Sequence, residues 1–277
     1  MDARSILLGY VAPSAGVVLG NVMFFAPYKS ARNAAVEGKL GDLNPTPWAF
    51  MTGNCAGWIA YSYLTQDYFL LVGNVPGLVL SIWMNMCASK LQYHEFMMSR
   101  IGEKIDDVTN TGHGNGSTDA DDTPPAKDAN GGGYSDGQVA APPAPHERLV
   151  VCIVVLWVLI FSSASLLPIS PSTARQIIGY CVIANLMFFY GAPLSTIAFV
   201  VRERNSGSIH RRTMAANTIN GAFWCAYGVG VGDPIIYGPN GAGAMLGVVQ
   251  MVLIVFFPAD DGGEGGSGGR RKLNSIP

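Results

Sequence analysis

The chain alternates between long apolar runs and short polar segments. Seven runs reach the length of about 20 residues that a helix needs to cross the apolar layer of a bilayer. They cover residues 6–28, 45–65, 68–88, 149–168, 177–201, 213–231 and 234–257. The first run is too long for a signal peptide and lacks a clear cleavage site of small residues. We therefore expect an all-α membrane protein with seven transmembrane helices.

The basic residues test this count. When alternate loops are assigned to opposite sides of the membrane, all of the 17 Lys and Arg residues except Arg4 and Arg175 fall on one side. Basic residues remain on the cytoplasmic side. The pattern predicts an N-terminus outside and a C-terminus in the cytoplasm, and an even number of helices would destroy it. We expect the plasma membrane.

The composition agrees with a membrane protein. Only 13% of the residues are charged, against about 25% in soluble domains. A net charge of -2 gives no basic surface for nucleic acid. The five cysteines lie in apolar runs without a CxxC or Cys/His pattern, which indicates packing residues rather than a metal site or disulfides.

Two segments are too polar to build a core. Residues 98–147 are rich in Gly, Asp, Asn and Pro, which predicts a disordered cytoplasmic loop. Residues 259–277 are rich in Gly and end in a small basic cluster, which predicts a flexible cytoplasmic tail.

The apolar part of the chain contains an internal repeat. Matching residues stand 166 positions apart, which chance does not produce repeatedly. The pairs are Pro27 and Pro193, Asn54 and Asn220, Trp58 and Trp224, Tyr61 and Tyr227, Asp67 and Asp233, and Asn74 and Asn240.

The repeat predicts the domain organisation. Residues 1–97 form a first three-helix repeat and residues 171–258 a second, with a linker helix over residues 148–170 between them. One intervening helix makes the two triples parallel, so that matched residues lie at the same depth across the central axis. The linker run has no charge and no motif, and we interpret it as a lipid-facing spacer.

Among the asparagines within the predicted spans, Asn54, Asn74, Asn220 and Asn240 form two matched pairs. A buried amide needs hydrogen-bond partners. One such residue usually joins two helices, but four at matched depth favour a polar central cavity. Asn54 and Trp58 are four residues apart on one helix face, as are Asn220 and Trp224. An amide beside an indole suits a neutral polyhydroxylated ligand.

The spans contain no charged residue deep inside, and proton- or sodium-coupled transporters usually need one. This absence favours uncoupled transport and argues against an enzyme, which needs a nucleophile with a base. No cofactor or metal is expected, because the four histidines form no ligand pattern. The matched prolines Pro27 and Pro193, with Pro47, are candidate hinges, and a static kink is the alternative.

The chain resembles the SWEET family of sugar facilitators, which has two three-helix repeats joined by a linker helix. The resemblance covers most of residues 6–258 outside the long loop. It rests on the short sequence motifs at residues 20–22, 190–194, 220–227 and 239–241.

The resemblance implies roles for individual residues. Trp58, Asn74, Trp224 and Asn240 resemble the sugar-binding pairs of the family. Asn54 and Asn220 match positions that influence sugar size, where Asn accompanies monosaccharides. Further candidates are the pocket-lining Met23, Phe188 and Phe189, the outer gate pair Tyr61 and Asp233, and the hinge prolines Pro27, Pro47 and Pro193. The fourth family proline is replaced by Thr213.

We therefore expect an uncoupled, bidirectional facilitator that moves a glucose-like hexose by alternating access. The alternatives are a repeat transporter for sucrose or another small neutral metabolite, and a membrane scaffold or receptor that does not transport. The small-residue face at residues 241–244 fits packing within the bundle and packing in a homo-oligomer equally well.

Overall fold

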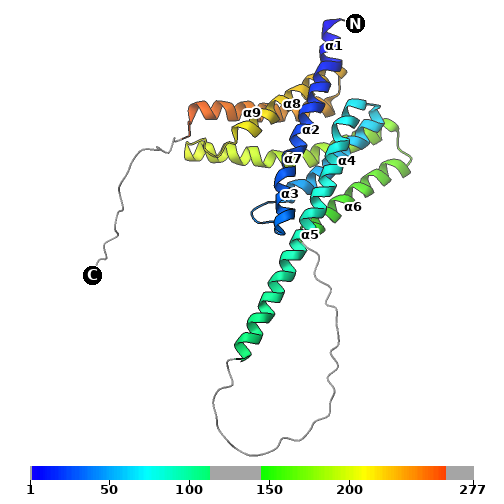
Figure 1. The fold of residues 1–277 in the computed structure, drawn as a ribbon. Helices are drawn as coiled ribbons and strands as arrows, with labels where there is room; N and C mark the ends of the chain where they lie inside the picture. Colours follow the sequence, from blue (N-terminus) through cyan, green and yellow to red (C-terminus); the bar gives the residue numbers. More distant parts are fainter. Residues whose placement is uncertain (1, 113–144, 260–277) are drawn as a thin grey trace, which may run out of the picture. The chain divides into compact units, whose positions relative to one another are not determined.

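The computed structural model describes residues 2–112 and 145–259, and the regular secondary structure in these two ranges is entirely helical. A helical segment covers each of the seven predicted runs. The elements are α1 (Ala3–Ile6), the π-helical turn η1 (Leu7–Val11), α2 (Ala12–Phe25), α3 (Tyr28–Glu37), α4 (Thr46–Thr65), α5 (Tyr68–Gly112), α6 (Pro145–Leu166), α7 (Pro171–Glu203), α8 (Arg211–Val231) and α9 (Pro234–Phe256), as Figure 1 shows.

Five helical segments within the described ranges are long and apolar enough to cross a membrane. They are Ala3–Glu37, Tyr68–Asp106, Pro145–Leu166, Pro171–Glu203 and Pro234–Phe256. The count of seven spans and the 3+1+3 arrangement therefore remain predictions.

The two predicted spans that fall short are α4 and α8, which are the second helices of the two predicted repeats. These helices carry Asn54 and Asn220. Because both copies fall short at the same place, their lower hydropathy is a property of the repeat unit. The polar site on these two helices remains a prediction.

The described chain divides into two compact units. The central unit contains Asn21–Val182, and the terminal unit contains Met1–Gly20 together with Ile183–Pro277. The divisions fall inside α2 and α7, at nearly matched positions of the predicted repeat. The N-terminal part of the first repeat, up to Gly20, thus belongs to the unit that contains α8 of the second repeat. In the same way, the N-terminal part of α7, up to Val182, belongs to the unit that contains α4 of the first repeat.

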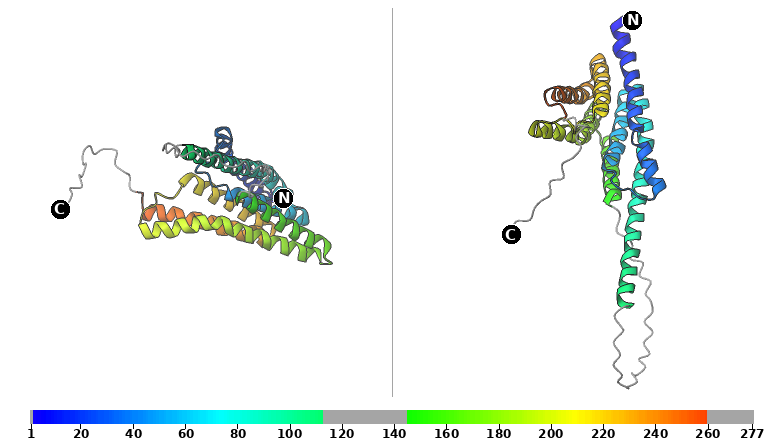
Figure 2. Two further views of the ribbon diagram at one scale, coloured as in Figure 1. Left: turned by 90° about the horizontal axis from the view of Figure 1, so that it is seen from below. Right: turned by 60° about the vertical axis from the view of Figure 1, so that its left-hand side comes forward.

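In the central unit, α4, α5 and α6 pack along one another (Figures 1 and 2). The turn from α4 to α5 is tight, because Gln66 adopts a left-handed conformation with φ of 56°. The side chain of Asp67 then accepts hydrogen bonds from the backbone N–H groups of Phe69 and Leu70, at 3.0 and 3.1 Å. A carboxylate in this position caps the start of α5.

The linker helix α6 is not a simple lipid-facing spacer. Ile153 and Trp157 are only 7% and 5% exposed, and they pack against Gly53 and Gly57 of α4. These glycines form a GxxxG motif, in which the missing side chains let another helix approach closely. Apolar side chains on the rest of α6 are exposed, so contact with lipid remains a prediction for that face alone.

A buried hydrogen-bond network also joins these three helices. The amide nitrogen of Asn85 (α5) donates to Thr52 Oγ1 (α4) at 2.8 Å, and Thr52 donates to Ser81 Oγ at 2.8 Å. His146 at the start of α6 donates through Nε2 to Asn85 Oδ1, at 2.9 Å. All four side chains are buried. The network pairs most of the polar groups that this packing removes from solvent.

In the terminal unit, α8 and α9 form the most extensive helix pair. They approach closely at Gly228, where an added Cβ atom would lie 2.5 Å from the backbone nitrogen of Tyr237. The turn between them repeats the α4–α5 turn, with Gly232 left-handed at φ of 71° and Asp233 capping α9. The N-terminal segment packs against α8, with Leu8 at Gly230 and Gly16 at Trp224.

Two features on the side predicted to be cytoplasmic differ from the predictions. The loop predicted over residues 98–147 is shorter at both ends, because α5 continues to Gly112 and α6 begins at Pro145. Residues 113–144 of this loop, and residues 260–277 of the predicted tail, lie outside the described residues. The short helix α3 was not predicted, and the loop after it is tied to α5 by a 2.7 Å hydrogen bond from Leu40 N to Glu95.

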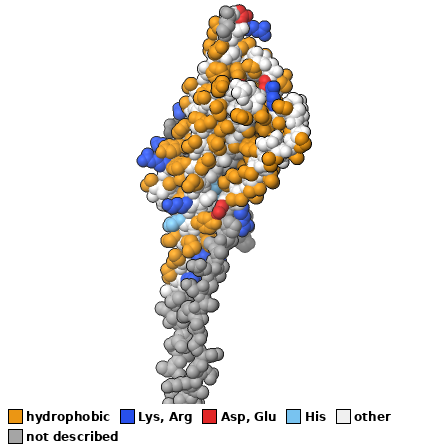
Figure 3. Space-filling view, turned by 90° about the vertical axis from the view of Figure 1, so that its right-hand side faces the viewer, with side chains coloured by type: hydrophobic (Ala, Val, Ile, Leu, Met, Phe, Trp, Pro, Cys, Tyr) orange, Lys and Arg blue, Asp and Glu red, His pale blue; other side chains and the backbone are white. Residues whose placement is uncertain are grey.

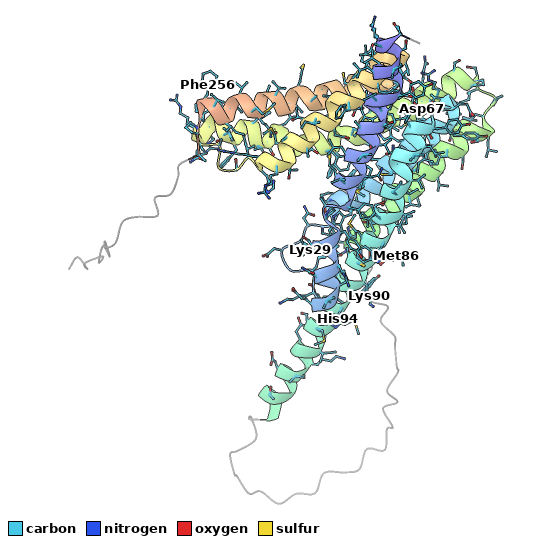
Figure 4. All side chains as sticks on the ribbon, turned by 45° about the horizontal axis from the view of Figure 1, so that its top comes forward. Lys29, Asp67, Met86, Lys90, His94 and Phe256 are labelled. Carbon is cyan, nitrogen blue, oxygen red and sulfur yellow. The ribbon has the colours of Figure 1, made fainter. Side chains whose placement is uncertain are left out.

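The surface agrees with a membrane protein. Large apolar side chains are exposed along the helices, and hydrophobic side chains are spread over the described part of the face shown in Figure 3. In the central unit, Lys90 and His94 lie toward one end of the helices, with Lys29, whereas Asp67 lies at the other (Figure 4). This separation agrees with the predicted sidedness, although the orientation of the termini remains a prediction.

Candidate functional site

The predicted site residues are distributed over both units as two matched sets. Asn54, Trp58 and Asn74 lie on α4 and α5 of the central unit, and Asn220, Trp224 and Asn240 lie on α8 and α9 of the terminal unit. Each set can be described by its own contacts.

Each of the two tryptophans packs against the tyrosine three residues after it. Trp58 packs against Tyr61 with ring centroids 5.8 Å apart and an interplanar angle of 88°. Trp224 packs against Tyr227 at 6.0 Å and 73°. Both pairs are edge-to-face, a favourable arrangement for aromatic rings. Each indole is therefore held at a defined angle by the tyrosine one turn further along its helix.

The asparagines of α5 and α9 are also held alike. Asn74 donates through its amide to the carbonyl oxygen of Leu70, at 2.8 Å. Asn240 donates to the carbonyl oxygen of Ile236, also at 2.8 Å. The acceptors are themselves 166 residues apart. This bond uses one amide hydrogen and fixes the side chain against its own helix, which leaves the carbonyl oxygen and the second hydrogen for another partner.

Asn54 and Asn220 differ from the other two asparagines. In each, the side-chain oxygen is buried and has no hydrogen-bond partner among the described residues. An unpaired buried acceptor is unfavourable by about 1–3 kcal/mol. The same deficit thus occurs at two matched positions of the predicted repeat.

The remaining pocket candidates have less uniform settings. Met23 is half-buried on α2 in the central unit. Phe188 and Phe189 of α7 lie in the terminal unit and pack edge-to-face on each other at 6.0 Å. Phe188 is 43% exposed.

The candidate hinge prolines occupy three different positions. Pro27 lies at the break between α2 and α3, Pro47 lies in the first turn of α4, and Pro193 lies inside the continuous helix α7. Thr213, which stands where the resemblance implies a fourth proline, lies in the first turn of α8, and its hydroxyl is hydrogen-bonded to His210 Nδ1 at 2.7 Å. The backbone N–H of Thr213 also donates to His210 Nδ1, at 3.4 Å, so His210 caps the start of α8.

The gate candidates are held within their own units. Tyr61 is fully buried, and Arg175 of α7 donates to its hydroxyl at 3.1 Å. Asp233 is 5% exposed and accepts from the backbone N–H of Ile235 at 3.0 Å.

Sequence reasoning missed two contacts near these residues. Arg175 appeared only as an exception in the charge distribution, and nothing in the pattern connected it with Tyr61. Tyr190 of α7 donates to the carbonyl oxygen of Pro239, next to Asn240. The sequence motif at residues 190–194 pointed to Tyr190, but it did not indicate that Pro239 is its hydrogen-bond partner.

Three comparisons agree on one family. A family model described as a sugar efflux transporter for intercellular exchange matches residues 176–261. The sorghum bidirectional sugar transporter SWEET2a is 33% identical over 39% of this chain and 44% of its own length. The sugar transporter SWEET1 of Caenorhabditis elegans is 24% identical over 85% of this chain and 61% of its own length. The chain therefore spans less than two thirds of the length of either relative.

The fold has a solved counterpart. The structure of a eukaryotic SWEET transporter matches 92% of this chain and 99% of its own chain, with a TM-score of 0.63 and 17% sequence identity. At this identity the match establishes the fold.

Proposed function

The chain belongs to the SWEET family, and from that premise we propose that it is an uncoupled, bidirectional facilitator that moves a neutral monosaccharide, a glucose-like hexose, by alternating access. The observation that carries the proposal is the presence of two Asn–Trp–Asn sets with the same contacts in both units. The named relatives are sugar transporters, and the amides and indoles supply a chemical reason for this cargo.

The amides suit hydroxyl groups. Asn54 and Asn220 each offer a buried oxygen without a partner among the described residues. A sugar hydroxyl that donates to this oxygen removes an unfavourable state, so binding gains more than it would from an amide that was already paired. Among the described residues, Asn74 and Asn240 each use one amide hydrogen in a bond to their own helix. Their side-chain oxygen and second amide hydrogen complement hydroxyls that donate and accept.

The indoles suit the C–H face of a pyranose ring. Their angle is fixed by Tyr61 and Tyr227. A ring that is already ordered loses little conformational entropy when a ligand stacks on it. Each of these rings favours a ligand with apolar faces and polar edges, which describes a hexose.

The absence of charge in the predicted spans supports uncoupled movement. A proton- or sodium-driven transporter uses an intramembrane ionisable group, and the seven apolar runs have none deep inside. A neutral site has no ion to desolvate as it changes the side to which it opens. Weak binding and low barriers then allow the cargo to leave in either direction.

Labelled glucose uptake into cells that lack their own sugar transport tests this proposal. Trp58→Ala and Asn240→Ala are each expected to abolish most of the uptake at wild-type surface expression. Trp83→Ala and Asn33→Ala are the matched controls, because they remove the same residue types outside the two sets, and they are expected to retain uptake. A protonophore should leave wild-type uptake unchanged.

Three results would count against the proposal. Full uptake in Trp58→Ala and Asn240→Ala would remove these residues from the site. Sensitivity to the protonophore would overturn the uncoupled mechanism. If well-expressed wild type took up neither glucose nor sucrose, the cargo would be another metabolite, or the protein would be a scaffold.

A further inference from the structure

Arg175 stands out in both sequence and structure. Together with Arg4 it breaks the otherwise one-sided distribution of basic residues. It lies in the first turns of α7 and is half-buried. Nothing in the proposed transport cycle so far uses this residue.

Arg175 contacts Tyr61 in two ways. Its Nε atom donates a hydrogen bond to the tyrosine hydroxyl at 3.1 Å. Its guanidinium carbon also lies 5.7 Å from the centroid of the tyrosine ring, within the range of a cation–π interaction. The hydroxyl and the ring plane of Tyr61 are therefore both restrained from the same side chain.

Tyr61 passes this restraint to Trp58. Tyr61 is fully buried, so its ring has little room to rotate. Its ring packs edge-to-face on the Trp58 indole at 5.8 Å. Arg175, Tyr61 and Trp58 thus form one continuous contact chain from the start of α7 to the indole on α4.

We infer that Arg175 is a positioning residue for sugar binding, which acts through Tyr61 to hold the Trp58 indole in the orientation that stacks on the sugar. The inference rests on the proposed function, because it requires Trp58 to contact the cargo. Arg175 itself touches no sugar in this proposal.

The other copy of the repeat indicates that the fold does not need an arginine for the Trp–Tyr packing itself. Tyr227 and Trp224 pack edge-to-face like their counterparts, but the residue 166 positions before Arg175 is Gly9. In that copy the indole lies against Gly16 instead, where an added Cβ atom would be 2.9 Å from its Nε1 atom. The two indoles are thus held by different means, and only the one on α4 has an arginine at the matched position.

The test is the concentration dependence of glucose uptake in Arg175→Met, Tyr61→Phe and the double variant, each corrected for surface expression. Tyr61→Phe keeps the ring and removes the hydroxyl that Arg175 contacts. Each single variant is expected to raise the KM about three- to tenfold, the factor that corresponds to one lost hydrogen bond, with a maximal rate within about twofold of wild type. The KM of the double variant should be no higher than the higher of the two single-variant KM values, because both changes remove the same contact.

Two further variants separate positioning from folding and from charge. Arg175→Lys keeps the charge and a donor, so it should recover part of the affinity. Arg4→Met removes the other outer basic residue and should leave the KM unchanged. If Arg175→Met does not reach the surface, Arg175→Lys and Tyr61→Phe still measure the link.

An unchanged KM in Arg175→Met, or a double variant in which the two effects multiply, would overturn the inference. This outcome differs from failure of the proposed function. If Trp58→Ala retained full uptake, the sugar site itself would be misplaced. If Trp58→Ala lost uptake while the Arg175 variants kept the wild-type KM, the site would stand and the positioning role would be wrong.

Discussion

The packing of α6 on α4 allows a sharp stability prediction at Gly57. An added Cβ atom there would lie 2.6 Å from Val182 Cγ2 and still closer to Trp157 Cη2. Unbonded carbon atoms prefer separations of about 3.5–4.0 Å, so Gly57→Ala requires a displacement of about 1 Å on two sides. Neither neighbouring side chain can move easily, because Trp157 is 5% exposed and Val182 is fully buried.

The expected loss follows from two opposing effects. Overpacking in a well-filled core costs about 1–3 kcal/mol. Because both neighbouring side chains are buried, we expect a cost at the upper end of this range. Alanine is a better helix former than glycine by about 1 kcal/mol. We therefore expect Gly57→Ala to lower the free energy of unfolding by about 2 kcal/mol, which corresponds to a melting temperature lower by about 4–8 °C.

Thermal melting of detergent-solubilised protein, followed by the loss of the monodisperse peak in size-exclusion chromatography, measures this effect. Gly191→Ala is the matched control, because it is also inside a helix and has open space around its added Cβ atom. It should melt at or above the wild-type temperature. Trp157→Leu should relieve much of the Gly57→Ala defect, so the two changes together should cost less than their sum.

A wild-type melting temperature for Gly57→Ala would refute the close packing of α6 on α4. An equal loss in Gly191→Ala would also refute it, because the cause would then be the helix interior rather than the contact. Strict additivity with Trp157→Leu would show that the indole is not the obstructing group.

Two further predictions concern the buried network and the start of α8. Asn85→Leu leaves His146 Nε2 without its buried acceptor and removes the donor to Thr52, which keeps its bond to Ser81. The melting experiment should show a loss of about 1–3 kcal/mol; a wild-type melting temperature would contradict the network. Thr213→Pro lies in the first turn of α8, where proline is tolerated. It should reach the surface at wild-type levels and melt within about 3 °C of wild type, whereas a larger loss would mean that the His210 contact is essential for the helix start.

Local patterns determined the positions of the helices. The predicted run 234–257 became α9 at Pro234–Phe256, and the run 45–65 became α4 at Thr46–Thr65. These limits follow from apolar length, from proline at helix starts and from turn residues between helices, all of which act over a few residues. The repeat was equally visible, and Asn74 and Asn240 make matching hydrogen bonds in the structure.

Tertiary structure decided which faces meet. The GxxxG motif at Gly53 and Gly57 is written in the sequence, but only the fold shows that Trp157 fills it and that α6 is therefore more than a spacer. Arg175 and Tyr61 are 114 residues apart, and no local periodicity joins them. A sequence pattern reports how a segment behaves toward water and lipid, whereas these contacts depend on the close approach of segments that are remote in the chain. For this reason the sequence predicted the paired Asn and Trp residues as a sugar site, and the structure was needed to find the side chains that hold them.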